Sequence, residues 1–110
     1  MSDYVPSPGD IVWLEFNPQA GHEQAGHRPA MVLSKKDYNR KTGLGIFCPI
    51  TSRIKGYPFE VPIAGKKIQG AILSDQIKSL DWKARNVKFI ESADHLILQD
   101  VIARISVILD

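Results

Sequence analysis

The first half of the chain alternates hydrophobic and polar positions with the period of two that is typical of β-strands. Between residues 11 and 16, one side of the expected strand carries Val12, Leu14 and Phe16, and the other carries Ile11, Trp13 and Glu15. Further short strands are expected at roughly 28–34, 45–51, 59–64, 71–74, 77–80 and 87–90. Proline lacks the backbone N–H that a central strand donates, so Pro62 predicts an edge strand or a bulge at 59–64.

The last part of the chain has a helical period instead. Apolar residues recur there at spacings of three and four: Leu98, Val101, Ile102, Ile105, Ile108 and Leu109. This pattern predicts an amphipathic helix, with Ser92 as its N-cap. A short helix is also expected at 35–43, after the second strand, capped by Ser34 and ended by Gly43. The elements predict a mainly β (α+β) fold, a small barrel or strongly bent antiparallel sheet closed by the C-terminal helix.

Length and composition limit the function classes. The 110 residues are expected to form one domain, 1–110. Cys48 is the only cysteine, so no intrachain disulfide and no cysteine-based zinc site is expected. No signal peptide, membrane-spanning apolar run or cofactor motif is recognised, which favours a cytoplasmic protein without a cofactor.

The charge is unevenly distributed along the chain. The net charge is +2, but residues 28–88 carry thirteen of the fourteen Lys and Arg and four acids, which gives +9, while the flanks carry −7. A positive middle attracts polyanions such as nucleic acid or an acidic protein tail, although an ordinary solvated surface is the simpler alternative. Tyr38, Tyr57 and Trp82 are interleaved with the basic residues, and Trp82 is a candidate for stacking on bases. For Trp13, packing in the core is the favoured interpretation.

Residues 22–34, HEQAGHRPAMVLS, combine acid–base groups with a fixed positive charge beside an apolar strand. Glu23 is a candidate general base for a ribose 2′-hydroxyl, and a solvated loop carboxylate is the alternative. Arg28 offers a planar fork of donors that suits two phosphate oxygens and charge developing in a transition state. The alternative is a surface arginine paired with Glu15 or Asp75.

Other polar residues stand at the ends of the expected strands. Thr51 and Ser52 end the third strand, and a hydroxyl there can donate to a phosphate oxygen. Asp75 and Gln76 also follow a strand, where Asp75 is either a second base, a group that orients Arg28, or a turn former. His22 and His27 are candidate proton donors, because imidazole titrates near neutrality, and without a third ligand a metal site is not expected.

Several of these segments together resemble one known family. They are PGDIVW at 8–13, GHEQAGHRPA at 21–30, Tyr38-Asn39, Pro49-Ile-Thr51, KGYPFEV at 55–61, SDQIKS at 74–79 and WKAR at 82–85. The chain resembles toxins of the MazF/PemK type, the endoribonuclease half of a bacterial toxin–antitoxin pair. The resemblance covers nearly all 110 residues.

The resemblance implies an SH3-like barrel with a C-terminal helix that acts as a homodimer. It implies a sequence-specific, metal-independent cleavage of single-stranded RNA, often messenger RNA. The ribose 2′-oxygen would attack the adjacent phosphorus, giving a 2′,3′-cyclic phosphate, or a 3′-phosphate after hydrolysis, and a 5′-hydroxyl. A cognate antitoxin with an acidic disordered tail would occupy the RNA groove. An ACA-like triplet is the preference of the members closest in pattern.

Residue by residue, the resemblance assigns catalysis to Glu23, Arg28 and Thr51. The plasmid-borne branch of the family uses the positions of His22 and Asp75, but it places an arginine where this chain has Leu73. Arg28 must therefore supply the cation, and the general acid stays open between His22, His27 and water. Gln76 is a further candidate, and the residues expected to contact RNA are Arg53, Lys55 and Lys78.

A protein of the same fold but another class is the alternative. CcdB-like toxins bind DNA gyrase through a C-terminal helix with a tryptophan-containing tip and cleave no RNA. This chain ends SVILD, without tryptophan, and has the Glu23/Arg28 pair. Both features favour the nuclease.

Overall fold

The computed structural model describes residues 3–15 and 27–109. In this part of the chain the strands are β1 (Asp10–Glu15), β2 (His27–Val32), β3 (Leu44–Thr51), β4 (Glu60–Ala64), β5 (Gln69–Leu73), β6 (Lys78–Asp81) and β7 (Lys88–Ser92). The helices are α1 (Lys36–Thr42) and α2 (His95–Leu109). Each expected strand is present, with bounds that differ by a few residues. Neither helix has the length and apolar composition needed to span a bilayer.

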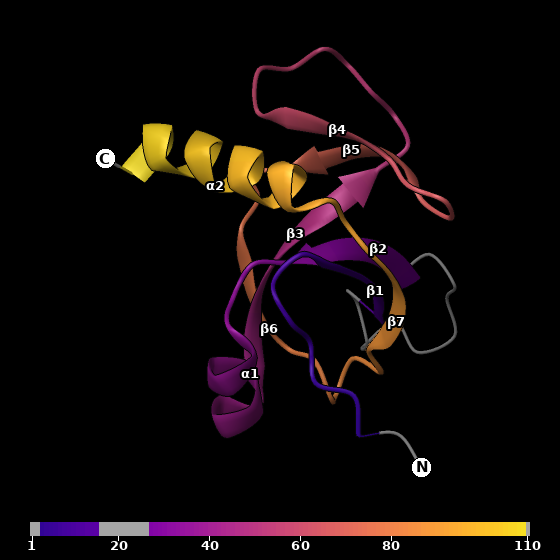
Figure 1. The fold of residues 1–110 in the computed structure, drawn as a ribbon, viewed down its shortest axis with the longest axis vertical. Helices are drawn as coiled ribbons and strands as arrows, with labels where there is room; N and C mark the ends of the chain where they lie inside the picture. The colour runs from indigo at the N-terminus through magenta and orange to yellow at the C-terminus, as the bar shows by residue number, and fades with distance from the viewer. Residues whose placement is uncertain (1–2, 16–26, 110) are drawn as a thin grey trace.

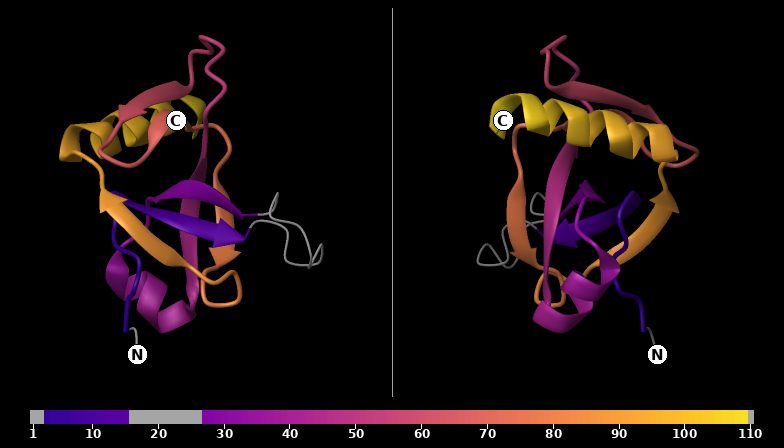
Figure 2. Two further views of the ribbon diagram at one scale, coloured as in Figure 1. Left: turned by 90° about the vertical axis from the view of Figure 1, so that its right-hand side faces the viewer. Right: turned by 60° about the vertical axis from the view of Figure 1, so that its left-hand side comes forward.

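The strands form one strongly curled antiparallel sheet. Their order is β4-β5-β3-β2-β1-β7, and β6 pairs with β3 outside this order. The long strand β3 causes the curl, because its beginning pairs with β6, its middle with β2 and its end with β5. Figures 1 and 2 show the resulting half-barrel, with α2 beside β4 and β5 and α1 at the opposite end. The predicted mainly β fold with two helices is confirmed, and Pro62 does stand in an edge strand, β4.

The alternation in β1 separates two hydrophobic clusters. Ile11 and Trp13 belong to the larger cluster, which also contains residues of β3, β4, β5 and α2. Val12 and Leu14 belong to the smaller one, which contains Phe47 and Trp82. Both faces of β1 are therefore covered, and the first cluster opens toward the cavity described below.

Two predicted helix caps are wrong. Lys35, not Ser34, is the residue before α1, and it makes no side-chain cap bond. The Ser34 hydroxyl donates instead to Oδ1 of the buried Asn39, at 2.5 Å. Ser92 is the last residue of β7, and the cap of α2 is Asp94, whose Oδ1 accepts from the Leu96 N–H at 2.9 Å. Gly43 ends α1 in the left-handed conformation, as predicted.

Helix α2 buries a narrower stripe than its sequence predicts. Leu98, Val101 and Ile105 pack against the larger cluster. Ile102 and Leu109, however, are 46% and 75% exposed, as Ile108 also is at 48%. A helix that crosses a curved sheet contacts it over one narrow stripe, so the neighbouring apolar positions stay uncovered.

Trp82 is a structural residue, which excludes the interpretation that it stacks on bases. Its side chain is 3% exposed. Its indole N–H donates to the carbonyl oxygens of Asn39 and Leu44, each at 3.2 Å. The indole is therefore committed to joining α1 and β3 to the segment after β6.

Candidate functional site

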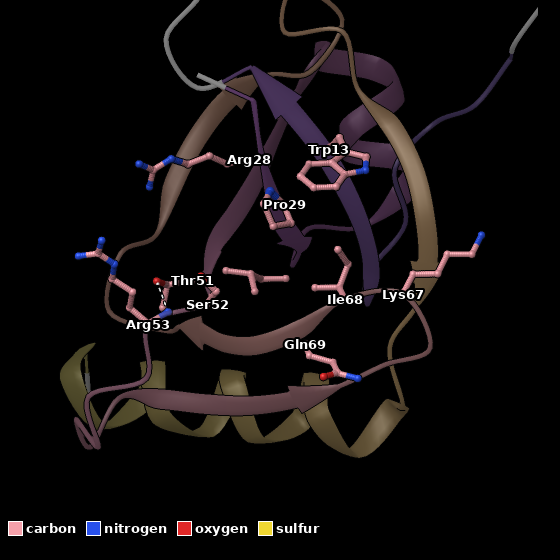
Figure 3. Close-up of a pocket in the computed structure, with 10 residues that line it drawn as sticks. Trp13, Arg28, Pro29, Thr51, Ser52, Arg53, Lys67, Ile68 and Gln69 are labelled. Carbon is pink, nitrogen blue, oxygen red and sulfur yellow. Dashed lines mark hydrogen bonds between the residues drawn. The ribbon is translucent and has the colours of Figure 1, made fainter. Parts of the chain in front are cut away.

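A cavity of about 660 Å³ lies where β2 begins, β3 ends and β4 turns into β5. We call it the Arg28 cavity; its lining residues are Trp13, Arg28, Pro29, Ile50, Thr51, Ser52, Arg53, Lys67, Ile68 and Gln69. Figure 3 shows the apolar side chains between two polar rims. Arg28 and Arg53 stand at one rim with Thr51 nearby, and Lys67 stands at the other. The cavity thus brings together three cations, and none of its lining residues within 3–15 and 27–109 is a carboxylate.

Strand register explains why Arg28 and Thr51 meet. Strands β2 and β3 are antiparallel, with Ala30 opposite Pro49. The same register, continued by two residues, brings Arg28 level with Thr51, which is 23 positions away in the sequence. The sequence predicted each residue separately, and the strand pairing places both on one cavity.

Arg28 is exposed and presents its guanidinium to solvent at the rim. Neither expected surface partner engages it. Oε2 of Glu15 accepts from the Asn86 amide at 3.0 Å, and Oδ2 of Asp75 accepts from the Tyr57 hydroxyl at 2.6 Å. Among the described residues no ion pair holds Arg28, so its fork of donors is available for a phosphate.

Thr51 is held more tightly than Arg28. Its Oγ1 accepts a hydrogen bond from the Arg53 N–H at 3.1 Å, which leaves the hydroxyl proton free to be donated. Gly70 of β5 backs the same residue, since a Cβ added there would lie 2.2 Å from the Thr51 carbonyl oxygen. The close approach of a glycine backbone therefore sets the position of Thr51.

A second cavity, of about 480 Å³, shares Thr51 and Arg53 with the first. We call it the Asp75 cavity; Lys55, Tyr57, Glu60, Leu73, Asp75 and Gln76 also line it. Hence Arg53, Lys55, Asp75 and Gln76, all singled out from the sequence, gather beside Thr51. Lys78 lies outside both cavities, in β6 opposite Phe47. Asp75 does not orient Arg28, because its carboxylate contacts Tyr57 instead.

The Tyr57–Asp75 contact changes the acidity of the phenol. The hydrogen bond to the Asp75 carboxylate, with a smaller effect of desolvation, raises the pKa of Tyr57 above its ordinary value. The Tyr57 hydroxyl is thus the donor of this pair, and Asp75 keeps a second oxygen that can accept.

Two carboxylates that the sequence analysis missed organise the loops around these cavities. Glu60 is 8% exposed and accepts from the backbone N–H groups of Lys55, Gly56 and Tyr57 at 3.0–3.2 Å. Glu91 does the same for the β4–β5 turn. An acidic residue within an apolar strand segment, as Glu60 is between Phe59 and Val61 and Glu91 is after Phe89-Ile90, is the sequence signal for such a role.

His27 begins β2 and stands edge-on to Trp13, with ring centroids 4.9 Å apart at an interplanar angle of 87°. Since Trp13 lines the Arg28 cavity, the imidazole lies beside that cavity. His22 and Glu23, the other two predicted acid–base residues of this segment, lie outside the described residues.

Cys48 is a buried core residue with no exposed surface. Burial, with a further contribution from the charge of Asp75, raises the pKa of its thiol to about 12. The thiol is therefore protonated at neutral pH and is not a nucleophile. Within the ranges 3–15 and 27–109, no group of three His, Cys, Asp or Glu residues is placed to hold a metal ion.

Comparisons with known proteins show which family the chain is similar to. Residues 7–109 match the family model described as "PemK-like, MazF-like toxin of type II toxin-antitoxin system". The endoribonuclease toxin MazF of Escherichia coli strain K12 is 53% identical over 85 residues, which cover 77% of each chain. Endoribonuclease PemK of E. coli is 34% identical over 106 residues, covering 92% of this chain and 80% of PemK.

Solved structures lead to the same group of proteins. The crystal structure of MazF (Form-I) from Deinococcus radiodurans superimposes with a TM-score of 0.88 and 48% identity, covering 97% of this chain and 98% of that one. A MazE–MazF crystal structure (Form-II) from the same organism gives a TM-score of 0.87 at 42% identity and 97% coverage of both chains.

Proposed function

The chain belongs to the PemK-like, MazF-like family of type II toxins, and from this premise we propose how its residues cleave RNA. It is an endoribonuclease toxin that acts on RNA and is neutralised by a cognate antitoxin. The relatives named above give the gyrase-binding alternative no support. One observation carries the proposal for the site: Arg28 and Thr51 line the same cavity, and Glu23 precedes Arg28 by five positions in the sequence.

In the proposed reaction, Glu23 accepts the proton of a ribose 2′-hydroxyl. The 2′-oxygen then forms a bond to the adjacent phosphorus, and the bond from phosphorus to the 5′-oxygen breaks. Arg28 binds the phosphate oxygens bidentately, and the Thr51 hydroxyl donates to one of them, so that both stabilise the charge that builds up in the transition state. His22, His27 or water gives the leaving 5′-oxygen its proton. The products are a 2′,3′-cyclic phosphate, or a 3′-phosphate after its hydrolysis, and a 5′-hydroxyl.

The substrate in this proposal is single-stranded RNA, including messenger RNA, cut at short sequences. The Asp75 cavity supports sequence selection, because Tyr57, Asp75 and Gln76 offer donors and acceptors to an unpaired base beside Thr51. Arg53 and Lys55 supply positive charge to the RNA backbone there. Lys78 remains a candidate contact for RNA that extends beyond the two cavities.

The proposal extends to assembly and location. We propose that residues 1–110 act as one toxin domain, that two copies form a homodimer, and that the protein works in the cytoplasm. The net charge of +9 over residues 28–88 suits an antitoxin with an acidic disordered tail that competes with RNA.

The decisive experiment maps the ends of RNA cut by the purified protein. A long RNA is incubated with the wild type and with Arg28→Lys, and the new 5′ ends are sequenced. We expect cuts at one short motif with 5′-hydroxyl ends, and a loss of most activity in Arg28→Lys, because lysine keeps the charge but not the fork. Cleavage by Arg28→Lys at the wild-type rate would remove Arg28 from the mechanism.

Two substrate and buffer controls test the chemistry. An oligonucleotide with a single 2′-deoxy substitution on the 5′ side of the scissile phosphate lacks the nucleophile and is expected to stay intact. EDTA is expected to leave the rate unchanged, since the proposed step uses no metal ion. Turnover of the deoxy substrate, or inactivation by the chelator, would each contradict the proposed step.

A further inference from the structure

The turn between β4 and β5 folds around a carboxylate from a distant strand. Oε1 of Glu91, in β7, accepts from the Lys66 N–H at 3.0 Å. Oε2 accepts from the N–H groups of Lys67 at 3.0 Å and Ile68 at 2.9 Å. Three consecutive backbone donors that converge on one carboxylate form an anion-binding nest, occupied here by a side chain of the same molecule.

The turn is built to admit this carboxylate. A Cβ at Gly65 would lie 2.4 Å from Oε2 of Glu91 and 2.9 Å from its Cδ, so glycine leaves the room that the carboxylate needs. The Gly65 N–H also donates to the Ile68 carbonyl at 2.9 Å, which closes the turn on itself. The bonds from Lys67, Ile68 and Lys66 lower the pKa of Glu91, and the carboxylate is ionised at neutral pH.

The same turn supplies the far wall of the Arg28 cavity. Lys67, Ile68 and Gln69 line it, and Ile68 also packs against the larger hydrophobic cluster. In Figure 3 Lys67 stands at the rim opposite Arg28 and Arg53. In the described part of the chain no ion pair engages its ammonium group, although its backbone is fixed. Among the described residues, Lys67 is thus a cation without an ion pair, although its charge helps to lower the pKa of Glu91. It stands on a turn held by backbone bonds, across the cavity from the proposed scissile phosphate.

We propose that Lys67 binds an RNA phosphate other than the scissile one, and that Glu91 is the positioning residue that fixes the turn carrying Lys67. This inference rests on the proposed RNA cleavage. A strand that lies across the cavity meets Arg28 at one rim and Lys67 at the other, so Lys67 contributes to binding and not to the chemical step. Glu91 contacts no RNA and acts only through the turn.

The test measures the affinity for RNA as a function of salt. The probe is a short single-stranded RNA with one mapped cleavage site, made uncleavable by a 2′-deoxy substitution. Neutralising one phosphate contact on a single strand changes the slope of log affinity against log salt concentration by about 0.7. For Lys67→Ala we expect several-fold weaker binding, a slope smaller by about 0.7, and kcat within about twofold of the wild type.

Lys66→Ala is the matched control. Lys66 is exposed on the same turn and uses the same kind of backbone bond to Glu91, but it does not line the cavity. Its loss is expected to leave the salt slope unchanged. A wild-type slope for Lys67→Ala, or equal changes in the two variants, would overturn the proposal.

Glu91→Gln tests the positioning role. The amide keeps the shape of the side chain but replaces one acceptor oxygen by a donor, which the turn cannot satisfy. We expect binding as weak as in Lys67→Ala, and no further loss when the two substitutions are combined, because both remove one contact. If the losses of RNA affinity in Glu91→Gln and Lys67→Ala were additive, and Glu91→Gln kept the wild-type salt slope, Glu91 would only stabilise the fold. That result would overturn its assigned role.

Other outcomes separate this inference from the proposed function. If the wild type does not cut RNA, the proposed function fails first. If the wild type cuts RNA and Lys67→Ala keeps the wild-type slope, only the Lys67 site fails. Circular dichroism shows whether Glu91→Gln folds. If it does not, the comparison of Lys67→Ala with Lys66→Ala still tests whether Lys67 binds a phosphate. Trimming the probe nucleotide by nucleotide from each end shows which phosphate Lys67 binds. Once that phosphate is removed, wild type and Lys67→Ala are expected to bind the probe with equal affinity.

Discussion

The Tyr57 hydroxyl donates a 2.6 Å hydrogen bond to Oδ2 of Asp75, across 18 positions of the sequence, in the cavity beside Thr51. The bond joins Asp75 to the loop that Glu60 holds through its bond with the Tyr57 N–H. Asp75 thus lines the Asp75 cavity together with Tyr57. We expect Arg28 to supply the cation for cleavage, since this chain has a leucine at position 73.

Removing the Asp75 carboxylate is expected to lower the pKa of Tyr57 toward its ordinary value near 10, because the charge that the hydroxyl faces disappears. The pKa of Tyr57 is measured from phenolate absorbance. Subtracting the titration of Asp75→Ala/Tyr57→Phe from that of Asp75→Ala removes the signal of the other tyrosines. Asp37→Ala is the control, since that carboxylate pairs with Arg40 on α1. An unchanged pKa in Asp75→Ala would mean that the hydrogen bond is not formed in solution.

Thr51→Val is expected to reduce kcat by about a hundredfold, while Thr51→Ser stays within about tenfold of the wild type. Valine keeps the branched shape of threonine but has no donor for the phosphate oxygen, and the loss of one such donor costs a factor of about 10²–10³. The rate is measured under single-turnover conditions on a short RNA. Equal activities of the valine and serine variants would show that the hydroxyl takes no part.

Gly70→Ala is expected to lower the free energy of unfolding by about 2 kcal/mol or more and to impair cleavage. The added Cβ would meet the Thr51 carbonyl oxygen at 2.2 Å, at a residue whose φ is already +150°. Gly43→Ala is the matched control, because its φ is +75° but no atom lies within 4 Å of the added Cβ. It should cost about 1 kcal/mol and leave cleavage intact. Urea denaturation measures both, and similar losses in the two variants would contradict the role of the close contact.

Acid is expected to remove the stabilisation that Glu91 provides. Its folded-state pKa lies below the ordinary value of 4.5, so the contribution is complete above that pH and is lost as the pH falls through the folded-state pKa. The difference in unfolding free energy between wild type and Glu91→Gln should therefore be constant from pH 7 to about 5 and shrink below pH 4.5. Urea denaturation at several pH values checks this, and a difference that persists undiminished at pH 3 would assign the effect to packing.

Local sequence explains most of the secondary structure but not the caps. Ser34 and Ser92 are good capping residues by type, yet tertiary contacts use Ser34 to hold the buried Asn39, and strand pairing keeps Ser92 in β7. The apolar positions 102, 108 and 109 have the helical spacing of core residues, but they stay exposed on α2. Periodicity shows which residues lie on one face, not how wide the facing surface is.

By itself the sequence determined the strand order along the chain, the two helices, the family, and the residue types that can cleave RNA, because these depend on side-chain chemistry and local spacing. Only the tertiary structure decided which of them meet. The β2–β3 register brings Arg28 to Thr51, and Tyr57 takes up Asp75. Two carboxylates, Glu60 and Glu91, hold the flanking loops through backbone bonds that span up to 25 residues. Such contacts arise from strand pairing and sheet curvature, which no window of neighbouring residues contains.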